Sequence, residues 1–163
     1  MSRTRWLVLA AVVATLGGWY FSPRNDIPQL VTGPISVSYD PDTARLTAVV
    51  NVRNNGDRPI VASITNDLFI DSQKQSLNDR TGPQPSRTEL GAEQLIPVTF
   101  TLQGDSAAAA WNGVRLMEVT INAVYEGDTG LNCHFTFMGR FYPQRKQIGI
   151  VSSVTSPREC RGR

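Results

Sequence analysis

The chain has 163 residues, of which 40% are hydrophobic and 18% are charged, and its formal net charge is +2. The low charged fraction argues against a disordered chain or a coiled coil, since both are usually rich in charged residues. The small net charge argues against nucleic-acid binding, which requires a basic surface that neutralises phosphates. The length suits one domain with an appendage.

An apolar run from Trp6 to Phe21 follows Arg3 and Arg5. As a helix it would be about 24 Å long, shorter than the hydrocarbon core of a bilayer, which favours a cleaved signal peptide. The aromatic residues at its far end suit the membrane interface, which favours a retained anchor. We expect a single-pass transmembrane anchor over residues 1–22, with the signal peptide as the alternative. The residues expected at the membrane interface are Arg5, Trp6, Trp19, Tyr20 and Phe21.

Residues 23–34 include three prolines and few periodic apolar residues, so we expect an extended tether there. The arginines before the apolar run keep the amino terminus in the cytoplasm under the positive-inside rule. The remaining residues, 35–163, are therefore expected to form an exported domain on the periplasmic or extracytoplasmic side of a cytoplasmic-type inner membrane.

Apolar residues alternate with polar ones in several stretches of this domain, which is the pattern of half-buried β-strands. Turn signals separate the stretches, among them Asp40–Thr43 and Asn54–Asp57, whose Asn-Gly pair suits a tight hairpin. Pro97 indicates an edge strand, because proline lacks a backbone N–H. The expected strands lie around residues 35–39, 46–52, 60–64, 68–70, 96–102, 119–125, 131–137 and 148–154.

One stretch breaks the alternation. Ser106 precedes four alanines and Trp111, which predicts a short helix that Ser106 caps and Gly113 ends. A second exception runs from Ser72 to Glu93, where a polar stretch without apolar periodicity predicts a long loop. Together these features predict an all-β fold, an antiparallel β-sandwich of seven or eight strands with one short helix across an end.

The segment from Asn51 to Ile60, NVRNNGDRPI, resembles the strand-turn-strand core of immunoglobulin-like domains of the water-stress, late-embryogenesis-abundant type 14, kind. A short helix before the last strands is similar as well. The resemblance implies an immunoglobulin-like β-sandwich that binds or scaffolds other molecules, although a fold alone assigns no function.

Cys133 and Cys160 are the only cysteines, and in an exported domain two cysteines usually pair. An intramolecular disulfide would close a loop of about 27 residues and contribute about 3 kcal/mol to stability. The alternatives are a buried free Cys133 and a bridge from Cys160 to another chain.

His134 is the only histidine, and it shares one face of its expected strand with Met138. Imidazole and thioether groups suit copper, but about 13 Å would separate the two Cα positions, which is long for one ion. Cys133 should point to the opposite face from His134, which argues against a catalytic Cys–His pair. We therefore expect no catalytic residue, no cofactor and no metal, with His134 and Met138 as the remaining metal candidates.

Two regions suit contact with a partner, namely the polar loop and the hairpin from Arg140 to Lys146. The residues expected to contact a partner are Arg80, Arg87, Arg140, Phe141, Tyr142 and Arg145. The expected function is that of a non-enzymatic accessory subunit of a larger integral membrane complex, whether respiratory, photosynthetic or transport. The alternative is a copper-handling or assembly factor for a membrane oxidase.

Overall fold

The computed structural model describes residues 29–75, 87–127, 130–156 and 158–160. The predicted anchor, the first half of the predicted tether and Arg80 lie outside these residues. Within the described ranges, no helix is long and apolar enough to cross a membrane.

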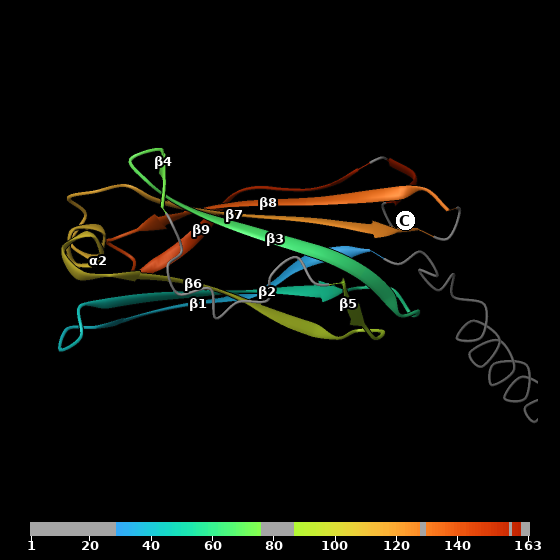
Figure 1. The fold of residues 1–163 in the computed structure, drawn as a ribbon, viewed down its shortest axis with the longest axis horizontal. Coiled ribbons are helices and arrows are strands. Elements are labelled where there is room, and N and C mark those ends of the chain that lie inside the picture. The colour runs from blue at the N-terminus through green and yellow to red at the C-terminus, as the bar shows by residue number, and fades with distance from the viewer. Residues whose placement is uncertain (1–28, 76–86, 128–129, 157, 161–163) are drawn as a thin grey trace, which may run out of the picture.

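Two antiparallel sheets face each other, which confirms the predicted β-sandwich (Figure 1). We call them the small sheet and the large sheet. The small sheet has the strand order β1-β2-β6, with β1 at Leu30–Asp40, β2 at Arg45–Asn54 and β6 at Leu95–Gln103. The large sheet has the order β4-β3-β7-β8-β9, and β5 also pairs with β3. Its strands are β3 (Ile60–Ile70), β4 (Gln73–Lys74), β5 (Arg87–Leu90), β7 (Met117–Glu126), β8 (Asn132–Tyr142) and β9 (Gln147–Ser156).

The core lies between the sheets because alternate residues of each strand point inward. Along β2 the inward residues are fully buried, and those of β7 and β8 face them across the sandwich. Each such aliphatic side chain contributes about 1.5–3 kcal/mol by leaving water. The largest contributors include Phe100, Tyr125, Phe135 and Phe137.

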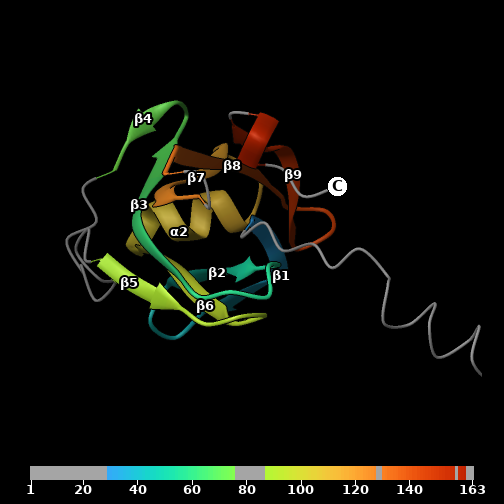
Figure 2. The same cartoon turned by 90° about the vertical axis from the view of Figure 1, so that its right-hand side faces the viewer.

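The helix α2 (Gly104–Trp111) joins β6 to β7 and lies between the two layers when the molecule is viewed end-on (Figure 2). Trp111 stacks against Tyr39 at a centroid distance of 5.2 Å and against Phe141 at 5.7 Å. Lys146 Nζ lies 4.0 Å from the Trp111 ring centroid and donates a 2.7 Å hydrogen bond to the Trp111 carbonyl. The helix lies across this end of the sandwich, as predicted, and the aromatic stack, which was not predicted, closes the end with it.

The start of the helix differs from the prediction. Gln103 is the N-cap residue, it makes no side-chain capping bond, and Ser106 lies inside the first turn. The end agrees better, because the helix ends at Trp111 and Gly113 follows with a φ of +78°. This left-handed conformation is the one that glycine adopts without strain.

The strand bounds differ from the prediction in three places. Strand β1 begins at Leu30, so residues 30–34 belong to the domain and not to the tether. The two short strands expected at 60–64 and 68–70 form one continuous strand, β3, which pairs with β7 along most of its length. The expected loop from Ser72 to Glu93 contains β4 and β5.

The segment Asn54–Asp57 is not a hairpin, because it carries the chain from the small sheet to the large one. The fully buried Asn54 side chain holds this corner. Its Oδ1 accepts a 3.0 Å bond from the Gly56 N–H, and its Nδ2 donates to the carbonyls of Arg58 at 2.7 Å and Gly91 at 3.1 Å. Asn54 thus ties the β2–β3 corner to the β5–β6 turn, in the manner of an Asx-turn.

Candidate docking surface

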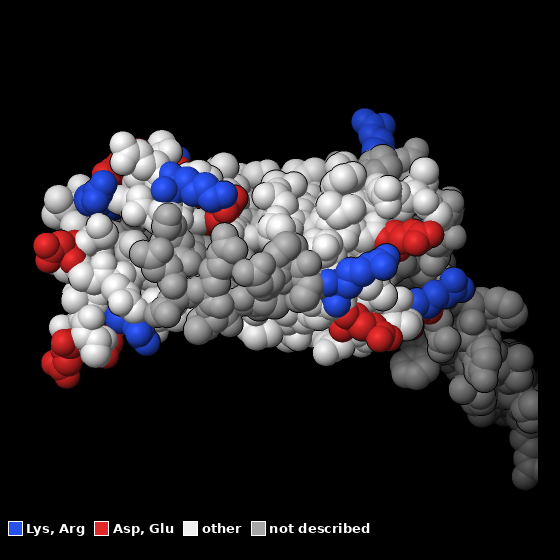
Figure 3. Space-filling model, viewed as in Figure 1, with Lys and Arg blue, Asp and Glu red and all other residues white. Residues whose placement is uncertain are grey.

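Among the described residues, charged side chains gather toward the two ends of the sandwich on the side drawn in Figure 3. On the outer face of the large sheet, Arg140 Nη2 pairs with Glu118 Oε1 at 2.8 Å and Lys74 Nζ pairs with Asp67 Oδ1 at 2.6 Å. Between Glu118 and Glu126, the described outer-face residues of β7, β8 and β9 include no Lys, Arg, Asp or Glu.

Exposed apolar side chains are distributed unevenly over the two sheets. On the outer face of the small sheet, Leu95 is the one large apolar side chain that is exposed among the described residues. Six exposed apolar side chains lie on β7, β8 and β9 of the large sheet, and we call them the β8–β9 patch. The patch consists of Val124, Met138, Tyr142 and Val154 on the outer face, with Ile150 and Val151 beside them at the edge of β9.

The strand pairing explains how the patch is assembled. Thr120 lies opposite Met138, Val124 opposite His134 and Thr136 opposite Val154, all on the outer face. The Tyr142 ring lies over Gly149, where an added Cβ would come within 2.7 Å of Tyr142 Cε2. An uncharged centre with methionine and tyrosine, bordered by ion pairs, is the composition of a protein interface.

A β-bulge in β9 places Val154 on the outer face. Met138 pairs with Ser152 and the next residue, Gly139, pairs with Ile150, so Val151 has no partner on β8. Without this extra residue, Ile148 and Val154 would face the same side of the sheet. Instead Ile148 is buried on the inner face, whereas Val154 lies on the outer face and is 42% exposed. Ile150 pairs with the inward-facing Gly139 and is 57% exposed because it lies at the open edge of the sheet. Bulges of this kind are common beside functional sites.

The residues predicted to contact a partner fall into two separate places. Arg87 begins β5 and is exposed, but β5 lies at the edge of the large sheet opposite β9. Arg140, Tyr142 and Arg145 lie together at the β8–β9 hairpin, where Tyr142 and Arg145 are exposed and Arg140 is bonded to Glu118. Arg80 lies outside the described residues.

The prediction that Phe141 contacts a partner is wrong, because Phe141 is only 3% exposed and stacks on Trp111. Alternation from Phe135 and Phe137 brings residue 141 to the inner face, so its role is in the core. Ile150, Val151 and Val154 are exposed as well, although the sequence did not predict them as surface residues. The adjacent pair Ile150-Val151 breaks the alternation of β9, and that break was the available signal for the bulge.

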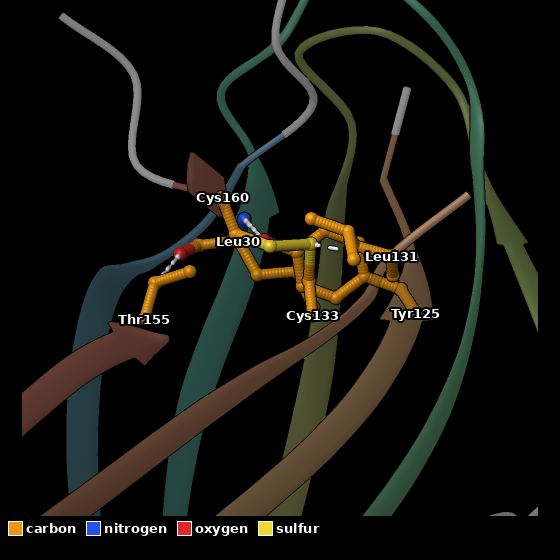
Figure 4. The surroundings of a disulfide bond; sticks show 6 residues. All are labelled: Leu30, Tyr125, Leu131, Cys133, Thr155 and Cys160. Carbon is orange, nitrogen blue, oxygen red and sulfur yellow. Dashed lines mark hydrogen bonds between the residues drawn. A yellow bond between two sulfur atoms is a disulfide. The ribbon is translucent and has the colours of Figure 1, made fainter. Parts of the chain in front are cut away.

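The predicted disulfide between Cys133 and Cys160 is confirmed (Figure 4). Its two Cα atoms are 5.8 Å apart, and both cysteines are buried. Cys160 belongs to the short helix η1 (Arg158–Cys160), so the bridge fastens the end of the chain to β8. An added Cβ on Gly127 would come within 2.9 Å of Cys133 Sγ, so glycine leaves room for the bridge.

The first residue of β1 lies beside this bridge (Figure 4). The Leu30 N–H donates to the Tyr125 hydroxyl at 3.4 Å, and the Thr155 hydroxyl donates to the Leu30 carbonyl at 3.1 Å. Burial raises the pKa of Tyr125. We call this end of the sandwich the base and the end that α2 closes the tip. The start of β1 and the helix η1 therefore meet at the base.

The metal candidates His134 and Met138 are both exposed on one face of β8, with Thr136 between them. The described part of the chain contains no group of three His, Cys, Asp or Glu residues that could hold a metal ion. Cys133 and Cys160 offer no thiolate while the disulfide is intact.

Comparison with protein-family models gives no match, and comparison with curated proteins gives none either.

Proposed function

We propose that this chain is a non-enzymatic, membrane-anchored accessory subunit that docks on the exported face of a larger integral membrane complex through the β8–β9 patch. One observation carries the proposal, namely the gathering of exposed apolar side chains on β7, β8 and β9 of the large sheet. The small sheet exposes Leu95 alone among its described large apolar residues. Apolar side chains kept in water at one place are typical of a surface that a partner covers.

The disulfide supports an exported domain, because such bridges persist in oxidising compartments outside the cytoplasm. The apolar run from Trp6 to Phe21 supports an anchor that places the base of the sandwich nearest the bilayer. Strand β9 has ten residues and is therefore about 33 Å long. A partner that covers the patch needs an exported loop or domain of comparable height.

We also infer that the domain belongs to the immunoglobulin-like class. The small sheet β1-β2-β6 and the strands β3, β7 and β8 of the large sheet follow the ABE and CFG order of that fold. The strand β9 then extends the large sheet by one strand. The buried Asn54 supports the resemblance to water-stress domains, since the segment that carries the resemblance includes this corner residue. Domains of this class bind other molecules more often than they catalyse reactions.

The alternative function, copper handling, is supported only by the position of His134 and Met138 on the same face of β8.

The proposal is tested by extracting the native membrane with a mild detergent and purifying the chain through a C-terminal tag. The expected result is a stoichiometric set of integral membrane subunits, identified by mass spectrometry and missing from an untagged control. Recovery of the chain alone would contradict the proposal. Detection of the peptide containing Trp6–Phe21 in the purified chain separates the anchor from the cleaved signal peptide.

A further inference from the structure

The two sheets have four lateral edges, and three of them are protected against pairing with another strand. Strand β1 carries Pro34 and a register shift between Thr32 and Ile35, and β6 carries Pro97. The outer edge of β3 is covered by the short strands β4 and β5. Prolines, bulges and short strands are the usual means of blocking an edge.

The fourth edge, that of β9, has weaker protection. Its sequence from Gln147 to Ser156 contains neither proline nor a charged residue, and its one protective feature is the bulge at Val151. Within the part of the chain that the structure describes, strand β9 pairs with β8 alone. An uncharged edge strand with unpaired backbone groups is a template for an added strand.

Strands β1 and β9 form a seam between the two sheets, and this seam is closed at both ends. At the base, Thr32 Oγ1 lies 2.9 Å from Ser153 Oγ. At the tip, the stack of Tyr39, Trp111 and Phe141 joins β1 to β8.

Between these closures, the described residues of β1 and β9 share no hydrogen bond. The inward residues Ile35 and Val37 of β1 pack against the core but stay partly exposed, and Ile150 of β9 is more than half exposed. The middle of the seam therefore presents apolar side chains from one sheet beside the open backbone edge of the other.

We propose that the middle of this seam takes an extended, uncharged strand of the partner protein, which pairs with β9 along Gln147–Ser152. The inference rests on the proposed function, because it specifies what the docking partner presents. Backbone groups of the added strand satisfy the free N–H and C=O groups of the edge, as in other cases of strand addition. Its inward side chains are apolar, since they pack on Ile35 and Val37. A charge there would be buried without a partner.

A second copy of the chain fits the edge less well. Two β9 edges related by a twofold axis would pair antiparallel, which would put the two bases at opposite ends, about 30 Å apart. Two copies anchored in one membrane have both bases at the bilayer. The occupant is therefore a strand of a different protein, and a second copy is an outcome that the experiment distinguishes.

The test introduces the photoreactive residue benzoylphenylalanine singly at positions 147, 150 and 151 of the full-length chain in its native membrane. Positions 95 and 114 are the controls, because Leu95 is exposed on the small sheet and Val114 is exposed after α2. The expected result is crosslinks from the three β9 positions to one partner segment. The linked residues should follow each other in the order of the β9 positions, with strand spacing of about 3.3 Å per residue. The control positions should not link to that segment.

A lysine at the edge provides the second readout. Ile150→Lys should reduce crosslinking from position 147 roughly tenfold, because edge lysines block strand pairing, whereas Val114→Lys should leave it unchanged. Links to partner residues that fit no single strand register, links to another copy, or no links at all from β9 would overturn the inference. If purification retrieves a partner but the β9 positions give no ordered series of crosslinks to one partner segment, the inference alone fails. If purification retrieves no partner, the proposed function fails as well.

Discussion

The Asn54 side chain bonds to backbone groups on both sides of the corner between the sheets. We expect Asn54→Ala to lower the free energy of unfolding by about 3 kcal/mol, because the partners left behind are buried and unsatisfied. Urea unfolding of the full-length chain in detergent, followed by circular dichroism, measures this loss. Asn51→Ala is the control, because the Asn51 side chain makes one exposed bond to the Pro34 carbonyl. Equal losses in the two variants would contradict this role of Asn54.

Asp71 links the start of the β3–β4 turn to the segment after α2. Its carboxylate accepts bonds from Arg115 Nε at 2.7 Å and from the Leu116 N–H at 2.8 Å, and these bonds hold the pKa of Asp71 below its ordinary value of 3.8. A carboxyl group with a lowered folded pKa stabilises the fold above its unfolded pKa. That contribution is lost as the pH falls through the lowered value.

Asp71→Asn should therefore be less stable than the wild type at pH 7, and the difference should shrink as the pH falls below about 4. Chemical unfolding at several pH values measures the difference. Asp57→Asn, at an exposed position of the β2–β3 corner, is the control variant in the same measurements. A difference for Asp71→Asn that persists at low pH would contradict the electrostatic origin.

Single residues were predictable from the sequence where one chemical rule decides their role. Cys133 and Cys160 had each other as the one possible partner within the chain, and they do pair. Phe141 was misplaced because Arg140–Lys146 was interpreted as a surface hairpin, although alternation from Phe135 already assigned residue 141 to the core. The partners of Asn54 lie at residues 90 and 91 as well as 58, and no local rule predicts such distant contacts.

At the scale of elements, α2 closes the tip mainly through Trp111. We expect Trp111→Ala to destabilise the fold by about 3 kcal/mol, because it removes the ring between Tyr39 and Phe141. Val114→Ala is the control, since Val114 is 78% exposed, and it should change stability by less than about 0.5 kcal/mol. The same urea titration compares the two variants, and a similar small effect for both would show that the stack does not hold the tip.

The disulfide holds η1 against β8 at the base. Cys160→Ser should lower the free energy of unfolding by about 3 kcal/mol, mainly because the unfolded chain loses the constraint of a loop of 27 residues. The wild type treated with a reducing agent should lose a similar amount, whereas Cys160→Ser should be insensitive to that agent. Unfolding at the same urea concentration with and without the bridge would contradict this prediction.

The elements were predictable where periodicity extends over many residues. The strands β2, β7 and β8 and the edge position of β6 follow from alternation and from Pro97. The Asn54–Asp57 turn was misread as a hairpin because local turn chemistry does not reveal whether the next strand joins the same sheet. The bulge at Val151 shifts the phase of β9 by one residue, and this shift depends on pairing with β8.

At the scale of the whole molecule, the base gathers the start of β1, the helix η1 and the disulfide, while the tip is closed by α2. With the proposed anchor at the base, the β8–β9 patch faces sideways along the membrane, where the exported part of a neighbouring membrane protein would stand.

The sandwich architecture was predictable from strand number and spacing. The patch was not, because its existence depends on which residues the bulge turns outward and on the contrast between the two outer faces. Arg87 and Arg140 were both predicted to contact a partner. In the structure they lie on opposite sides of the large sheet, and Arg140 is bonded to Glu118.

The central claim is that the β8–β9 patch docks the chain on a membrane partner, and one paired comparison tests it most directly. Val154→Arg and Leu95→Arg place the same charge at similarly exposed positions, 42% and 44%, on the large and the small sheet. Both variants are purified from native membranes, with an intact disulfide and an unchanged circular dichroism spectrum as the test of folding. We predict that Val154→Arg loses roughly tenfold or more of the co-purifying partner and that Leu95→Arg retains it, because a charge buried in an apolar interface is costly. Retention of the partner by both variants, or its loss from Leu95→Arg alone, would contradict docking through the patch.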